Sequence, residues 1–203
     1  LLGKSDSNID EFDILLFARR DIEEFLFTNI KVISSCTFEC CKNLNRVVIP
    51  TDSNLHTIES NAFSYTKIKE IFIPSKVSKI CEYAFSKCKN LTKVEIPADS
   101  ILETIDAFEK VNIKEFFIAS KVSKICYRAF YFCRELEKVE IPTNSSLEII
   151  GIDAFANQKL KKNFIPSNAS KISKYTFSEF KNLTKVEIQK NAELVHFIET
   201  INI

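Results

Sequence analysis

A short alternation of apolar and polar residues recurs along the whole chain. In the segment 91–97, Leu91, Val94 and Ile96 are apolar, while Lys93 and Glu95 between them are charged. This alternation predicts a half-buried β-strand with its apolar side chains in the core. Related segments are LNRVVIP (44–50), IKEIFIP (68–74), LTKVEIP (91–97), IKEFFIA (113–119), LEKVEIP (136–142), LKKNFIP (160–166) and LTKVEIQ (183–189). A proline ends most of them, as expected where a strand stops.

A second pattern follows each of these segments. It has a hydrophobic residue three positions before an isoleucine, and then Ala-Phe or Thr-Phe, as in KVSKICEYAF (76–85) and KVSKICYRAF (121–130). We expect this set to pack the wall opposite the strand, with Ala-Phe on a single helical turn. The phenylalanines that mark it are Phe38, Phe63, Phe85, Phe108, Phe130, Phe155 and Phe177.

The repeat length indicates the architecture. Equivalent isoleucines, such as Ile73 and Ile96, lie 22 to 24 residues apart, which is too short for a pair of helices and fits one strand with a compact return. The pattern therefore predicts a solenoid in which each coil adds one strand to a parallel sheet. Alternate coils match best, giving a double unit of 45–47 residues. Two residues are missing between Ile105 and Phe108, so we expect a pinched wall there.

We predict one repeat domain over residues 1–203. Residues 1–28 are expected to form an N-terminal cap or variant coil, and 29–193 about seven coils of 22–25 residues in 45–47-residue pairs. Residues 194–203 are expected to begin an incomplete coil of a chain that continues beyond this sequence. Because no polar cap closes this end, self-association through the C-terminal edge is also an expectation.

The combined pattern, read in 77–91 and 122–136, resembles the BspA-like branch of leucine-rich repeats, including the surface-antigen-like proteins of parasitic mucosal protists and bacteria. The resemblance implies a right-handed leucine-rich-repeat solenoid with a parallel β-sheet on one face and short strands or single helical turns on the other. It also implies a surface antigen or adhesion protein, at the cell surface or secreted, that binds host or neighbouring proteins. An intracellular, cytoplasmic scaffold is the alternative. Ala119 and Gln189 in place of proline, and Phe180 in place of cysteine, depart from the pattern.

Charge and hydropathy exclude some classes of partner. The 28 basic and 27 acidic residues nearly cancel and are spread evenly along the chain, which predicts no field that would attract nucleic acid or anionic lipid. No apolar run reaches the roughly 18 residues of a membrane span. We therefore expect a protein partner, with no nucleic acid and no membrane insertion in this segment.

The chain offers little catalytic chemistry. Its two histidines, His56 and His196, have no evident nucleophile beside them. The seven cysteines mostly occupy equivalent positions two coils apart, roughly 9 to 10 Å, which is too far for a disulfide. They are most simply small buried hydrophobic residues, although the cluster Cys36, Cys40 and Cys41 leaves a zinc site open. We predict no catalytic residue, metal or cofactor, and hence no enzyme.

Stacking of the coils should align the outward strand positions into two ladders. The first contains Glu24, Arg46, Glu70, Lys93, Glu115, Lys138, Lys162 and Lys185. Its signs alternate for most of its length, which favours pairing between neighbouring strands. The second contains Leu26, Val48, Phe72, Glu95, Phe117, Glu140, Phe164 and Glu187. Exposed phenylalanines at intervals of roughly 10 Å are a candidate partner-binding site, formed by Phe72, Phe117, Phe164, Glu95, Glu140, Glu187, Lys93 and Lys138. The alternatives are that lysine stems cover the rings, or that phenylalanine simply suits a strand.

Overall fold

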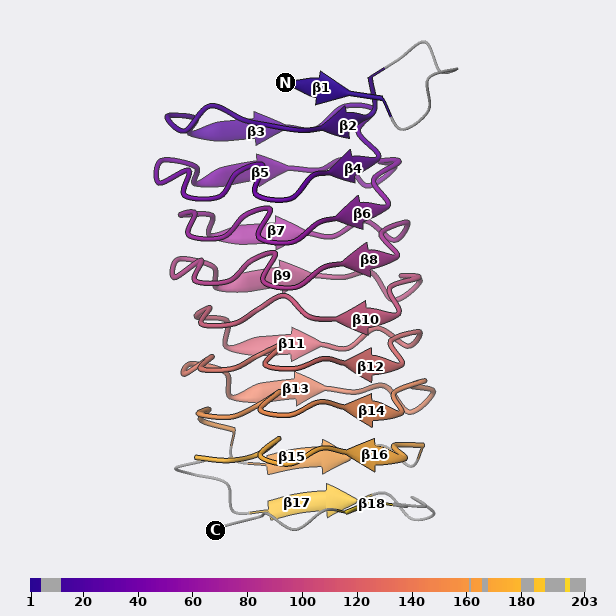
Figure 1. The fold of residues 1–203 in the computed structure, drawn as a ribbon. Helices are drawn as coiled ribbons and strands as arrows, with labels where there is room; N and C mark the ends of the chain where they lie inside the picture. The colour runs from indigo at the N-terminus through magenta and orange to yellow at the C-terminus, as the bar shows by residue number, and fades with distance from the viewer. Residues whose placement is uncertain (5–11, 161, 166–167, 180–184, 189–195, 198–203) are drawn as a thin grey trace.

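The computed structural model describes residues 1–4, 12–160, 162–165, 168–179, 185–188 and 196–197, which wind into a β-solenoid of stacked coils (Figure 1). Each coil contributes a strand to each of two opposite walls, so the predicted repeat architecture is confirmed. One wall is a continuous ten-stranded sheet in the order β1-β2-β4-β6-β8-β10-β12-β14-β16-β18. Its strands are β1 (Leu2–Gly3), β2 (Ile14–Leu15), β4 (Val32–Ile33), β6 (Thr57–Ile58), β8 (Lys79–Ile80), β10 (Thr104–Ile105), β12 (Lys124–Ile125), β14 (Ile149–Ile150), β16 (Lys171–Ile172) and β18 (His196–Phe197).

The opposite wall, which we call the strand wall, is not the continuous sheet that the sequence led us to expect. Its strands pair only two by two, as β3-β5, β7-β9, β11-β13 and β15-β17. They are β3 (Glu24–Leu26), β5 (Arg46–Val48), β7 (Glu70–Phe72), β9 (Lys93–Glu95), β11 (Glu115–Phe117), β13 (Lys138–Glu140), β15 (Lys162–Ile165) and β17 (Lys185–Ile188). The prediction was wrong about which wall is continuous, because the two-residue strands that contain the recurring isoleucines form the long sheet instead, which is parallel except for the antiparallel pair β1-β2.

Turn length accounts for this pairing. Phe85 precedes the first residue of β9 by eight positions, whereas Phe63 precedes β7 by seven. Every strand that follows the longer turn is paired with the strand before it, and among the described strands no ladder joins β5, β9 or β13 to the next strand of this wall. In the longer turns a buried cysteine donates its thiol to the preceding coil, as from Cys88 to the Phe63 carbonyl at 3.0 Å and from Cys133 to the Phe108 carbonyl at 2.9 Å. These contacts tie the longer coil to its predecessor.

A row of phenylalanine rings runs through the core. Seven rings stack nearly parallel from coil to coil, with centroids 5.0 to 6.1 Å apart. They are Phe38, Phe63, Phe85, Phe108, Phe130, Phe155 and Phe177, and six of them are at most 2% exposed. The predicted phenylalanine packing is therefore confirmed, and the rings supply dispersion and hydrophobic contact between coils.

The Ala-Phe pairs lie in hydrogen-bonded turns and not in the single helical turns that we expected, and the described residues contain no helix. Left-handed residues flank most of these pairs on both sides, such as Tyr83 (φ 60°) and Lys87 (φ 60°) around Ala84 and Phe85. A left-handed residue cannot continue a right-handed helix. Its N–H instead points along the stack, so that Tyr83 N donates to the Asp106 carbonyl in the next coil at 2.9 Å.

The shortened coil at Ile105 to Phe108 disturbs the long sheet locally. β8 and β10 share only the register pair Thr104↔Lys79, whereas β6 and β8 share two pairs. The coil also lacks a left-handed residue before Ala107, the position that Tyr83 and Arg128 fill in its neighbours. The missing residues correspond to Glu82 and Tyr83 of the preceding coil, so Asp106 is followed directly by Ala107.

Candidate functional site

The two predicted ladders are present on the strand wall within each strand pair. Glu70 is in register with Lys93, and Glu115 with Lys138. The second ladder is aligned in the same way, with the register pairs Leu26↔Val48, Phe72↔Glu95 and Phe117↔Glu140. The structure therefore brings six of the eight predicted site residues to one face, in alternating aromatic and charged rungs.

For the remaining two residues, Phe164 and Glu187, the structure describes only the backbone. They are register partners in β15 and β17, and their side chains lie outside the described part of the structure. The predicted contribution of these two side chains to a binding site therefore stays a prediction.

Ion pairs on the strand wall differ from the expected cross-strand pattern. Arg46 does reach across to Glu24, at 3.4 Å. Lys93, however, pairs with Glu95 on its own strand. Hydrogen bonding and charge from Glu95, followed by the more distant Glu70, raise the pKa of Lys93. Same-strand pairing links the two ladders.

The equivalent pair lies two coils further on, where Lys138 pairs with Glu140. Hydrogen bonding and charge from Glu140 raise the pKa of Lys138, with a smaller effect of Glu115. These lysines therefore partly neutralise the glutamates that stand beside the phenylalanines, and they do not fix the strand register.

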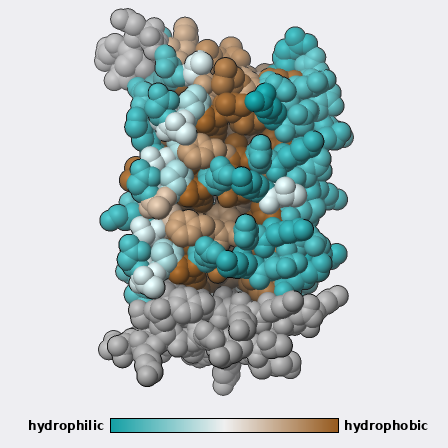
Figure 2. All heavy atoms as spheres, turned by 180° about the vertical axis from the view of Figure 1, so that it is seen from behind, coloured by the Kyte–Doolittle hydropathy of each residue, from teal (hydrophilic) through white to brown (hydrophobic). Residues whose placement is uncertain are grey.

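The Phe72 and Phe117 rings are half-buried. Within the described residues, no cationic group lies over either ring. The alternative that the aliphatic lysine stems cover the rings stays a prediction, since it concerns the methylene groups and not the ammonium groups. Figure 2 shows an apolar stripe running along the stack on this side of the molecule, with polar side chains on both flanks.

Two grooves open beside these rings, at breaks in strand pairing. One, of about 530 Å³, lies between β5 and β7 and includes Val48 and Phe72 in its lining. The other, of about 560 Å³, lies between β9 and β11 and includes Glu95 and Phe117. In both places the neighbouring strands belong to separate sheets. The repeat therefore builds a similar groove twice, two coils apart.

The cysteines are free thiols, and the prediction of burial holds for some of them. Cys41, Cys88 and Cys133 are buried, whereas Cys81 and Cys126 are half-buried and Cys40 is exposed. The buried thiols of Cys88 and Cys133 also act as hydrogen-bond donors. The sequence analysis predicted only small buried hydrophobic residues at these positions and no hydrogen-bonding role. Nowhere in the described ranges do three His, Cys, Asp or Glu side chains form a group able to hold a metal.

Burial predicts large differences in thiol reactivity. It raises the pKa of Cys88 to about 11 and that of Cys133 to about 12, so few reactive thiolates form at these positions near neutral pH. We expect a thiol-alkylating reagent at pH 8 to modify the exposed Cys40 first and to spare Cys88 and Cys133. Peptide mass spectrometry measures this, with denatured protein as the fully labelled control. Fast native labelling of Cys88 would contradict the buried, hydrogen-bonded geometry.

Asp106 is a feature that sequence reasoning did not single out. It occupies, in its shortened coil, the position after the isoleucine that Cys81 and Cys126 occupy in the coils on either side. Burial, and then the nearby charge of Glu82, raises the pKa of Asp106 to about 7. The sequence could have pointed to Asp106, because this repeat position holds a carboxyl group where the coils on either side have a cysteine.

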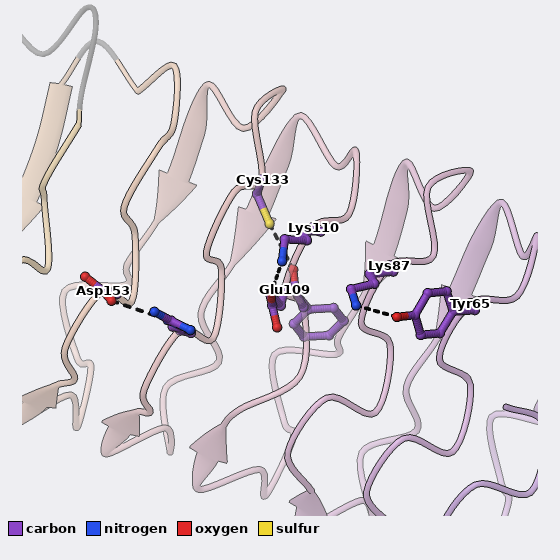
Figure 3. Close-up of polar contacts among 8 residues, drawn as sticks. Tyr65, Lys87, Glu109, Lys110, Cys133 and Asp153 are labelled. Atoms are coloured by element: carbon purple, nitrogen blue, oxygen red, sulfur yellow. Dashed lines mark hydrogen bonds and ion pairs between the residues drawn. The ribbon is translucent and has the colours of Figure 1, made fainter. Parts of the chain in front are cut away.

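The turn edge of the solenoid carries a second group of polar contacts, shown in Figure 3. Lys87 donates to the Tyr65 hydroxyl of the coil before it. Lys110 pairs with Glu109 at 2.6 Å, and Arg128 reaches Asp153 of the next coil at 3.3 Å. The Lys87–Tyr65 and Arg128–Asp153 contacts link successive turns, whereas the Lys110–Glu109 pair lies within one turn.

Comparisons with known proteins agree with this architecture. The sequence profile of the BspA type leucine rich repeat region matches in six copies, over residues 11–116 and 104–200. No curated protein matches the chain. The described residues include no helix long and apolar enough to cross a membrane.

Two bacterial proteins of known structure are similar to this chain. A leucine-rich repeat protein from Bacteroides ovatus superimposes with a TM-score of 0.68 at 23% identity, over 90% of this chain and 54% of that one. A leucine rich cell surface protein from Faecalibacterium prausnitzii gives 0.46 at 22% identity, over 83% and 60% of the two chains. The chain thus spans little more than half the length of these proteins. The profile matches across nearly the whole sequence show that this chain belongs to the BspA-type leucine-rich repeat family.

Proposed function

We propose that this protein is a non-catalytic interaction module that binds a partner protein through the strand wall, as a surface antigen or adhesion protein does. The observation that carries the proposal is the repeated placement of Phe72 and Phe117, half-buried and without a covering cation, beside two similar grooves. Aromatic side chains that stay partly exposed in concave, apolar surroundings supply much of the binding energy of protein interfaces.

The neighbouring charges support a role in specificity. Glu95 and Glu140 stand in register with the two phenylalanines, each beside its paired lysine. A partner that approaches the rings must therefore match a fixed pattern of apolar and charged groups, which excludes partners of the wrong charge more than it adds affinity. Phe164 and Glu187 would extend the pattern by one further unit.

The experiment changes Phe72, Phe117 and Phe164 together to serine. We expect this triple variant to fold like the wild type and to lose partner binding, because it removes the aromatic anchors and leaves the buried ring stack intact. Immobilised wild-type and variant proteins are compared for the proteins that they retain from extracts, and the affinity of each retained protein is then measured by calorimetry.

The matched control changes aromatic residues on another surface. Tyr65, Tyr127 and Tyr175 are 44%, 44% and 51% exposed on the turn edge, and their replacement by serine should leave binding unchanged. If the phenylalanine triple variant keeps its affinity while the tyrosine variant loses it, the binding site lies on the turn edge and the proposal is wrong.

We further propose a location at the cell surface, with the intracellular scaffold as the competing role. The family resemblance supports the surface location. Antibody labelling of intact cells compared with permeabilised cells tests it. Signal only after permeabilisation would rule out the surface role and direct the search to internal partners.

A further inference from the structure

The turns that lead into the strand wall align basic side chains along one edge of the solenoid. We call this surface the basic edge. Its members are Lys42, Lys67, Lys87, Lys89, Lys110, Arg134 and Lys159. These residues are far apart in the sequence and follow the core phenylalanine of their coils by two to four positions.

Backbone hydrogen bonds hold these turns in register. Tyr65 N donates to the Ser86 carbonyl at 3.0 Å, Lys87 N to the Glu109 carbonyl at 2.9 Å, and Lys110 N to the Tyr131 carbonyl at 2.8 Å. Successive turns therefore stack at the coil spacing of roughly 4.8 Å. Each coil from that of Phe38 to that of Phe155 contributes at least one cationic group to this line.

The positive charge of the basic edge is only partly compensated. Lys42, Lys67 and Lys89 are exposed and form no ion pair in the described ranges. Two of the acidic residues near these positions are paired with basic residues of the edge. Glu109 is 8% exposed and paired with Lys110, and Glu135 is paired with Lys159 at 3.0 Å.

A third acidic residue, Glu39, hydrogen-bonds with the Cys36 thiol. A fourth acidic residue, Glu179, is exposed, follows Phe177 by two positions and lies beside Arg134 and Lys159, so it offsets part of the positive charge. The acidic residues that precede the Ala-Phe pairs lie at the end nearer the ten-stranded sheet: Glu59, Glu82, Asp106 and Asp153. The basic edge therefore has an excess of positive charge although the chain as a whole is nearly neutral.

A surface with excess positive charge can bind an extended, negatively charged polymer, and the side chains of the basic edge restrict which kind of polymer it can bind. The aromatic rings beside it are capped by cations, with Lys87 4.6 Å from the Tyr65 ring centroid and Arg134 4.8 Å from that of Phe132. Capped rings offer no platform for stacking bases, which single-stranded nucleic acids require. The backbone N–H groups of Tyr65 and Lys87 are used between coils, so they cannot bind an acidic peptide backbone.

What remains are the exposed lysine ammonium groups of the edge, such as those of Lys42, Lys67 and Lys89, and these act as point charges without a fixed geometry. From this we infer that the basic edge binds a linear sulfated polysaccharide, whose closely spaced anionic groups run along the stack. This site is separate from the strand wall and does not depend on the proposed partner-binding face.

The test uses heparin as the sulfated polysaccharide and measures its dissociation constant at several salt concentrations. We expect binding in low salt that weakens steeply as salt rises, because each lysine contact releases a counterion. A variant with Lys42→Glu, Lys67→Glu and Lys89→Glu should bind at least about tenfold more weakly.

A matched variant separates the edge from net charge alone. Lys79→Glu, Lys121→Glu and Lys171→Glu make the same charge change at exposed positions on the ten-stranded sheet and one of its loops, and this variant should keep nearly full affinity. No heparin binding in low salt, or an equal loss in both variants, would overturn the inference.

Single-stranded DNA that competes as strongly as heparin would also overturn it, because it would show a nucleic-acid site. Binding of heparin by the serine variant of Phe72, Phe117 and Phe164 shows that the two sites are independent.

Discussion

Replacing Phe108 by alanine should lower the free energy of unfolding by about 3 to 5 kcal/mol, the largest effect expected of any single change discussed for this protein. The Phe108 ring is fully buried, stacks between Phe85 and Phe130 with centroids 5.3 and 5.7 Å away, and meets Phe116 at 5.1 Å. Its removal leaves a cavity that neighbouring coils can close only by moving the stacked backbone.

Denaturant unfolding followed by circular dichroism measures this effect, with Phe117→Ala as the control. Phe117 is half-buried on the strand wall, so its truncation should cost about 1 kcal/mol or less. Because each coil is stabilised mainly by its neighbours, the Phe108 variant should also unfold less cooperatively, in two parts. Equal losses for the two variants would show that the ring stack does not hold the coils together.

Replacing Asp106 by asparagine should stabilise the protein above pH 7 and have little effect near pH 4. Burial and the charge of Glu82 raise the pKa of Asp106 from 3.8 to about 7 in the folded protein. Between these values the folded state binds a proton that the unfolded state has released, so this residue's contribution to stability falls as pH rises from about 4 to about 7. A shift of this size corresponds to about 4 kcal/mol, which solvent around a half-buried group reduces to roughly 2 to 3 kcal/mol.

The measurement is the difference in unfolding free energy between the Asp106→Asn variant and the wild type, at pH values from 4 to 8. We expect it to grow through this range and level off above pH 7, because asparagine resembles the protonated carboxyl group. Asp99→Asn, in an exposed loop, controls for the loss of one negative charge. A difference that does not change with pH would mean that Asp106 is not protonated in the folded state.

The sequence was sufficient to predict the coil length, the inward and outward faces of each strand, and the core phenylalanines. These follow from local alternation and from the repeat, which place every equivalent residue in the same environment. The register pairs Phe72↔Glu95 and Phe117↔Glu140 were predictable for the same reason. The residues of the candidate site could therefore be predicted from the sequence, but the grooves beside them could not.

The shape of the site depended on distances between coils, which local patterns do not contain. One additional residue in alternate turns decides that β7 pairs with β9 but not with β5, and this produces the grooves beside Phe72 and Phe117. The ion-pair partner of Lys93 also differs from the cross-strand partner that the sequence led us to expect. Lys93 pairs with Glu95 on its own strand, and the sequence pattern does not contain the distances that decide this.

Sequence alone determined that this protein is a repeat solenoid with an aromatic and charged ladder, because each coil repeats the same pattern of apolar and polar positions. Only the tertiary structure decided what lies side by side. Lysines that are spread evenly along the chain become neighbours on the basic edge, and Asp106 is brought near Glu82 in the shortened coil. Stacking converts a separation of 22 to 24 residues into a distance of about 5 Å, and electrostatic interactions depend on that distance and not on position in the sequence.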